Sequence, residues 1–144
     1  MKILVATSGN YDPEVDSVHS AFSFPWPKGS EIHVLSVAEV IYPVMVGMVP
    51  DPIDPSDFEL ESGEEARSGA NSAALRFREL GFQAEGFSMK GVPETEILEH
   101  AKEWGADLIV VGSHDLSRLE RFLVGSIAEQ VVKHAPCSVL VLKH

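Results

Sequence analysis

Short runs of consecutive apolar residues alternate along this chain with longer segments in which apolar residues recur every three or four positions. Runs that are apolar at consecutive positions are typical of strands that are covered on both faces of a parallel sheet. Five strands are therefore expected, over residues 3–6, 32–37, 82–89, 108–111 and 139–142, of which the third has the weakest pattern.

The intervening segments have helical periodicity. Gly81 and Gly105 stand where helices would end, Pro93 stands near a helix start, and Pro136 stops the last helix. The resulting order β-α-β-α-β-α-β-α-β predicts a single doubly wound α/β domain over residues 1–144, with helices on both faces of the sheet. The four expected helices lie around residues 14–22, 66–77, 97–104 and 127–132.

The connection after the second strand, residues 38–57, is expected to be a long loop of the kind that often binds ligands or acts as a lid. It holds four of the nine prolines and no basic residue. Residues 51–65 carry seven acids and no base, which suits a solvated loop leading into a helix, since acids favour a helix N-terminus.

Composition narrows the possible partners and location. The net charge of −11 argues against nucleic acid and anionic membranes as partners. The longest largely apolar stretch, residues 40–50, is well short of the roughly 20 residues that cross a bilayer, so no membrane role is expected. The single cysteine, Cys137, excludes an internal disulfide and a multi-cysteine zinc site, and it favours a cytoplasmic location.

Two of the expected strands end in segments with glycine and hydroxyl residues. Residues 7–10 (Thr-Ser-Gly-Asn) follow the first strand, and residues 112–115 (Gly-Ser-His-Asp) follow the fourth. In open α/β sheets, ligands bind at such carboxyl ends. Gly125 and Ser126 open the last helix, where free backbone amides suit an anion such as phosphate. The alternative is that Ser126 is only an N-cap.

Together these segments resemble the universal stress protein family. The nucleotide-binding branch of that family has the signature G-x2-G-x9-G-[ST], and Gly112, Asp115, Gly125 and Ser126 reproduce its spacing. The stretches ADLIVVGSH, GSIAEQVVKHAPCSVLVL, KILVAT and GVPETEIL also match. The resemblance implies a five-stranded parallel sheet of order 3-2-1-4-5 and a homodimer formed through the last strand, residues 138–143, an apolar edge that proteins usually cover.

The resemblance further implies that ATP or another adenine nucleotide binds at the strand ends. Adenine would contact the backbone near Val37, and the phosphates would lie against Gly112, Gly125 and Ser126. The nucleotide-binding residues expected on this basis are Thr7, Ser8, Val37, Gly112, His114, Asp115, Gly125, Ser126 and Ile127. No catalytic residue is assigned.

Two residues depart from the family pattern. Ser8 replaces an acid that would contact the ribose, and Asp115 replaces the second glycine of the signature. A carboxylate about 4 Å from a phosphate is repelled by about 1 to 4 kcal/mol. Mg²⁺ or Mn²⁺ held by Asp115, neutralisation by Arg118 or Arg121, or a ligand with fewer phosphates would relieve this repulsion. The alternative is that Asp115 only caps a turn and no nucleotide binds.

The leading hypothesis is a stress-response regulatory module that binds an adenine nucleotide and acts as a homodimer. The alternative is a nucleotide-free dimeric scaffold that works through contacts with an unknown protein partner. Because no nucleophile, general base or Walker motif is recognisable, enzymatic activity would be at most that of a slow ATPase. The apolar residues 42–50 could cover a nucleobase, contact a partner or pack over the sheet edge.

Overall fold

The computed structural model describes residues 1–7, 18–39, 55–112 and 126–142. They include one five-stranded sheet of order β3-β2-β1-β4-β5, in which every neighbouring pair is parallel. This confirms the α/β fold class and the strand order expected from the sequence. The strands are β1 (Lys2–Thr7), β2 (Glu31–Glu39), β3 (Gln83–Gly91), β4 (Leu108–Gly112) and β5 (Ser138–Leu142).

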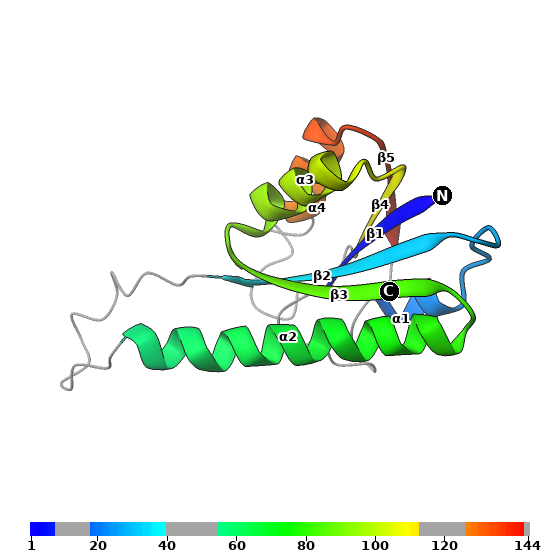
Figure 1. The fold of residues 1–144 in the computed structure, drawn as a ribbon. Coiled ribbons are helices and arrows are strands. Elements are labelled where there is room, and N and C mark those ends of the chain that lie inside the picture. Colours follow the sequence, from blue (N-terminus) through cyan, green and yellow to red (C-terminus); the bar gives the residue numbers. More distant parts are fainter. Residues whose placement is uncertain (8–17, 40–54, 113–125, 143–144) are drawn as a thin grey trace.

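Helices cover both faces of this sheet. Figure 1 shows α1 and the long α2 on one face, and α3 and α4 together on the other. No helix within the described ranges is long and apolar enough to cross a membrane. The helices are α1 (Val18–Phe22), α2 (Pro55–Glu79), α3 (Pro93–Trp104) and α4 (Ser126–His134).

The central strand β1 divides the hydrophobic core into two layers. Ile3 and Val5 face α1 and α2, and they pack in one cluster with Phe77 of α2. Leu4 points to the opposite face, where it packs with Ile97 of α3 and with α4. Since side chains alternate along a strand, a run of consecutive apolar residues is what a strand between two helical layers requires.

The helix ends follow the signals in the sequence. Pro93 is the first residue of α3, where its missing N–H costs no helical hydrogen bond. Gly105 ends α3 in the left-handed conformation at φ 77°, and its N–H donates to the carbonyl of Ala101 at 3.0 Å. Cys137, just before β5, is partly buried against the core, and burial raises the pKa of its thiol, as expected for a small hydrophobic residue.

The connection between β2 and α2 is shorter than the predicted loop over residues 38–57. Ala38 and Glu39 still belong to β2, because they pair with Lys90 and Gly91 of β3. At the other end, α2 begins at Pro55, which is the one helical position that proline favours. The predicted loop over residues 42–50 lies outside the described residues, as does the first part of the predicted helix over residues 14–22.

Helix α2 approaches β3 closely at one glycine. A Cβ atom on Gly86 would lie 2.8 Å from the carbonyl carbon and oxygen of Ala70 in α2, and 2.8 Å from Oδ1 of Asn71. Two of these atoms belong to the helix backbone and cannot turn away. The absent side chain at Gly86 therefore fixes how near α2 can lie to the edge of the sheet.

We expect Gly86→Ala to lower the free energy of unfolding by about 1–3 kcal/mol, because the added methyl group overpacks the contact between α2 and β3. Gly63→Ala is the matched control. Its Cβ would meet only Cε of Lys90 at 3.7 Å, and alanine favours a helix by about 1 kcal/mol over glycine. Urea denaturation of both variants checks this. A Gly86→Ala protein as stable as the wild type would contradict the close approach.

Candidate functional site

The ends of β1 and β4 lie side by side at the carboxyl edge of the sheet. Val5 pairs with Val110, and Thr7 and Gly112 each follow two residues further on. Strand order reverses at this pair, since β2 and β3 lie to one side of β1, while β4 and β5 lie to the other. The chain leaves the two strands toward opposite helical layers, which is the arrangement that opens a ligand crevice in α/β sheets.

Predicted site residues come to this edge from both layers. Thr7 lies two residues beyond Val5, so its side chain is on the same face of the sheet as Val5, the face that α1 and α2 cover. Val37, near the end of β2, and Ile127, at the start of α4, pack in the core on the other face. The edge therefore combines a hydroxyl from one face with apolar side chains from the other.

The side chain of Thr7 is buried without a hydrogen bond. The residue is only 9% exposed, and its Oγ1 has no hydrogen-bond partner among the described residues. A buried hydroxyl normally finds a partner, because leaving it unpaired costs about 1–3 kcal/mol. An unpaired buried hydroxyl at a strand end is what we expect where a bound ligand supplies the missing hydrogen bond.

The start of α4 has electrostatics that favour an anion. The helix begins at Ser126, and the first N–H groups of any helix point outward without helical acceptors. Its first turn holds one acid, Glu129, which would oppose an anion. That carboxylate accepts a 2.9 Å contact from Nζ of Lys133, whose hydrogen bond lowers the pKa of Glu129. The negative charge of Glu129 is thus paired with Lys133, one turn further along the helix.

Five of the nine predicted nucleotide-binding residues are placed by the structure: Thr7, Val37, Gly112, Ser126 and Ile127. They all belong to the carboxyl ends of strands or to the first turn of α4. The other four lie outside the described residues, together with both arginines of the same connection: Ser8, His114, Asp115, Gly125, Arg118 and Arg121.

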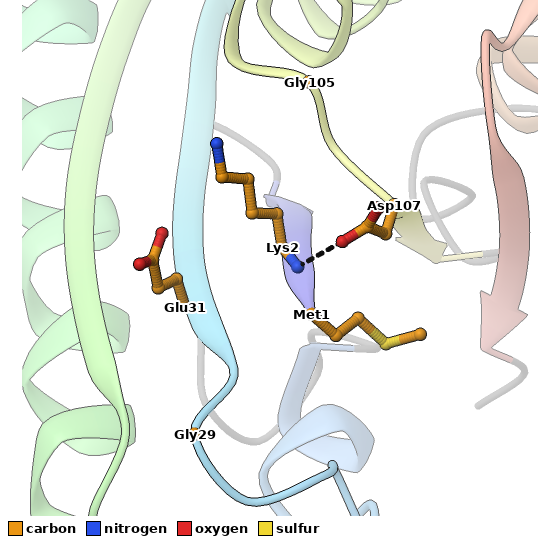
Figure 2. A pocket seen from close by; sticks show the side chains of 6 residues that line it. All are labelled: Met1, Lys2, Gly29, Glu31, Gly105 and Asp107. Atoms are coloured by element: carbon orange, nitrogen blue, oxygen red, sulfur yellow. Dashed lines mark hydrogen bonds between the residues drawn. The ribbon is translucent and has the colours of Figure 1, made fainter.

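A pocket within the described part of the chain lies at the opposite, amino-terminal end of the strands. Its volume is about 350 Å³. Figure 2 shows its lining residues at and just before the amino ends of β1, β2 and β4. The backbone N–H of Lys2 donates to the carboxylate of Asp107 at 2.8 Å, and the N–H of Asp107 donates back to the carbonyl of Lys2. These two hydrogen bonds join the start of β1 to Asp107, just before β4. We recognise no catalytic arrangement among the residues that line this pocket.

Two histidines that sequence spacing left unassigned also meet in the fold. His33 of β2 and His100 of α3 approach to 3.0 Å. The sequence contained a sign that His100 is buried, because His100 has helical spacing to Ile97 and to Trp104 and so lies on the same face of α3. Within the described ranges, no three histidine, cysteine or carboxylate side chains gather as metal ligands.

The chain matches the universal stress protein family over residues 1–143, and it belongs to that family. It is 34% identical over 144 residues to the universal stress protein MJ0531 of Methanocaldococcus jannaschii, an alignment that covers 99% of this chain and 81% of the relative. It is 33% identical to the universal stress protein YxiE of Bacillus subtilis, over 99% of this chain and 98% of the relative.

Solved structures have the same fold. The structure of MJ0577 from M. jannaschii superposes with a TM-score of 0.78 at 26% identity, over 99% of this chain and 95% of that one. A universal stress protein family protein from Arabidopsis thaliana with AMP bound gives a TM-score of 0.69 at 24% identity, over 100% and 92%. A universal stress protein in complex with cAMP gives 0.65 at 21%, over 99% and 96%.

We expect Thr7→Val to raise the free energy of unfolding of the ligand-free protein by about 1 kcal/mol, because it removes a buried hydroxyl without a partner. The matched control is Ser30→Ala. The Ser30 hydroxyl is also buried, but it donates to the carbonyl of Pro27 at 2.7 Å. Its removal should lower stability by about 1 kcal/mol. Equal losses in the two variants, measured by urea denaturation, would contradict the unpaired state of Thr7.

Proposed function

We propose that this protein is a stress-response regulatory module that binds ATP or another adenine nucleotide at the carboxyl edge of its sheet. The observation that carries the proposal is the buried, unpaired hydroxyl of Thr7, which lies at the point where strand order reverses. A ligand with sugar and phosphate oxygens would supply the missing hydrogen bond. Family membership and the AMP and cAMP complexes of proteins with the same fold support adenine nucleotides as the ligand class.

The proposed binding mode follows from the chemistry of the edge. Phosphates would accept hydrogen bonds from backbone N–H groups at Gly112, Gly125 and Ser126, where the positive end of α4 favours an anion. Adenine would lie on the apolar side, near Val37 and Ile127. The remaining proposed contacts with the nucleotide, around its sugar and phosphates, are those of Thr7, Ser8 and His114.

We propose that Asp115 takes part through a divalent cation. Oxygen ligands from a carboxylate and from phosphates are the set that Mg²⁺ and Mn²⁺ prefer. A cation between them would turn the repulsion of two anions into an attraction. Without it, a repulsion of about 1 to 4 kcal/mol would weaken binding roughly fivefold to several hundredfold.

The output of such a module would be a change of conformation or partner with nucleotide state. A nucleotide can shift an equilibrium between two states only through different affinities for them. Rapid hydrolysis is not part of the proposal. The second candidate is a nucleotide-free dimeric scaffold, favoured by the two departures from the family signature, Ser8 and Asp115.

We expect freshly purified protein to release adenine nucleotide on heat denaturation, and to bind ATP at micromolar concentration with Mg²⁺ in calorimetric titration. Thr7→Val should weaken binding about five- to tenfold, as the loss of one hydrogen bond of about 1–1.4 kcal/mol implies. Asp115→Ala should remove the metal dependence. Ser30→Ala, which alters a buried hydroxyl away from this edge, should leave the affinity unchanged.

Other outcomes separate the two candidate functions. Absence of bound nucleotide, together with no binding at millimolar ATP and Mg²⁺, would contradict the module and favour the scaffold. Binding that is independent of metal in the wild type and in Asp115→Ala would retain the nucleotide but remove the cation from the proposal.

We further propose that the protein acts as a homodimer through β5. This strand forms one edge of the sheet, and its sequence SVLVL carries no charge to discourage pairing. Val141 is 37% exposed there. A second copy of the strand would bury this apolar side chain and satisfy the open backbone groups of the edge.

We expect Val141→Glu to convert the dimer to a monomer in analytical ultracentrifugation, because a charge would be buried in the interface. Leu75→Glu is the matched control, since Leu75 is a 53% exposed apolar residue on α2 and lies away from β5. It should remain dimeric. A wild-type monomer, or a dimer that survives Val141→Glu, would contradict the role of this edge.

A further inference from the structure

A pair of histidines joins α3 to the sheet. Nδ1 of His33, on β2, lies 3.0 Å from Nε2 of His100, on α3, although the residues are 67 positions apart in the chain. His100 is buried at 8% exposure, and His33 is partly buried. Both side chains lie in the layer between the sheet and α3, on the same face of β2 as Leu35 and Val37.

Aromatic rings fix the position of this pair. The ring of Trp104 stacks on His33 with centroids 3.5 Å apart and planes within 10° of parallel. Phe87 of β3 lies 4.5 Å from His33 and 4.8 Å from His100, between centroids. The two imidazoles therefore lie against aromatic rings, with His100 buried and His33 partly buried.

Charged groups from each neighbouring element act on the pair. Lys2 of β1 donates from Nζ to the carbonyl of Trp104 at 3.2 Å and lies 5.6 Å above the Trp104 ring, so it opposes a positive charge on His33. The carboxylates of Glu85 on β3 and Glu31 on β2 favour that charge, and Glu103 on α3 does so for His100.

The balance of these effects favours the neutral rings. Burial is the largest cause, and it lowers the pKa of both histidines below the ordinary value of 6.5. The proximity of His100 lowers the pKa of His33 further. The carboxylates act in the opposite direction without reversing the shift.

Proton counting shows what acidification does to the contact. An N–H···N hydrogen bond needs one proton between the two facing nitrogens, with one ring as donor and the other as acceptor. Neutral rings satisfy this, and so does a pair that holds one extra proton. When both rings are protonated, each nitrogen carries a hydrogen toward the other at 3.0 Å, and the contact cannot persist.

We propose that the His33–His100 contact is an acid-sensitive attachment that holds α3 against β2 and β3 at neutral pH and releases it as the pair is protonated. This regulation does not rest on nucleotide binding. Ile97 and Ala101 remain packed in the core with strand residues such as Leu35 and with α4. The release is therefore confined to the part of α3 around His100, and it does not unfold the domain.

The sign of the pH dependence follows from proton linkage. Because both pKa values are lowered in the folded state, the open state binds more protons once the pH falls below about 6.5. The attachment is complete above that pH and is lost as the pH falls through the folded-state values. Each histidine can shift the equilibrium by up to about tenfold per pH unit in that range.

Hydrogen exchange of the wild-type protein at pH 7.5 and 5.5 tests this directly. After correction for intrinsic exchange rates, protection of the amides of α3 around His100 should fall at pH 5.5, by up to about tenfold for each histidine. The amides of α2, on the far face of the sheet, provide the internal reference and should change much less.

The double variant His33→Asn with His100→Gln places non-titrating amide groups where the two facing imidazole nitrogens lie. It should keep α3 protected at both pH values. The matched control is His134→Gln, at an exposed histidine on α4, which should keep the full response. A pH response of equal size in the double variant would overturn the proposal.

Imidazole titration by nuclear magnetic resonance of the wild type gives a second readout that does not depend on folding of the variants. His33 and His100 should titrate below 6.5 in two coupled steps, and the amide shifts of α3 should change with the second step. Titration of both rings without any change in α3 would overturn the proposal.

Discussion

The structure depends on the complete burial of β1. Ile3, Leu4 and Val5 have no exposed surface, and the strand is paired along both edges, with β2 on one side and β4 on the other. A strand in that position needs a helical layer on each face, so the connections through α1 and α2 run over one face and those through α3 and α4 run over the other. The two sets of connections diverge at the carboxyl ends of β1 and β4, where the candidate site lies. The candidate site is thus a consequence of how the core is closed.

Much of this fold could be predicted because its determinants are local. Runs of consecutive apolar residues identified the buried strands, and Pro93 and Gly105 bounded α3 correctly. The pattern of β3 was weak because that strand is the other edge of the sheet, with one partner and mostly partial burial. The connection after β2 was predicted too long, since its prolines suggested a loop throughout. Pro55 instead begins α2, and pairing with β3, which the sequence does not reveal, extends β2 to Glu39.

The candidate site could be predicted only where topology determines position. Thr7 and Gly112 end neighbouring strands, so their approach followed from strand order alone. The unpaired state of the Thr7 hydroxyl depends on packing around it and could not be predicted. The contact of His33 with His100 is harder still to predict. It depends on which face of β2 holds His33, on which face of α3 holds His100, and on where the helix crosses the strand. Periodicity gives the two faces but not the place where the elements cross.

Helix α3 links the histidine pair to the end of the sheet where the candidate nucleotide site lies. It starts where β3 ends, at the carboxyl edge that also holds the candidate nucleotide site, and it returns the chain to the amino edge before β4. A protonation that loosens α3 therefore acts on an element whose first turn lies at the same edge as the site. Coupling between proton and nucleotide would follow only if the nucleotide bound the attached and released states with different affinities. Such coupling is reciprocal, so a nucleotide that preferred the attached state would lower the pKa values of the histidine pair further, and acid would weaken its binding by the same factor. Under that condition, the pair would make nucleotide occupancy in this chain depend on pH from a position outside the proposed nucleotide site.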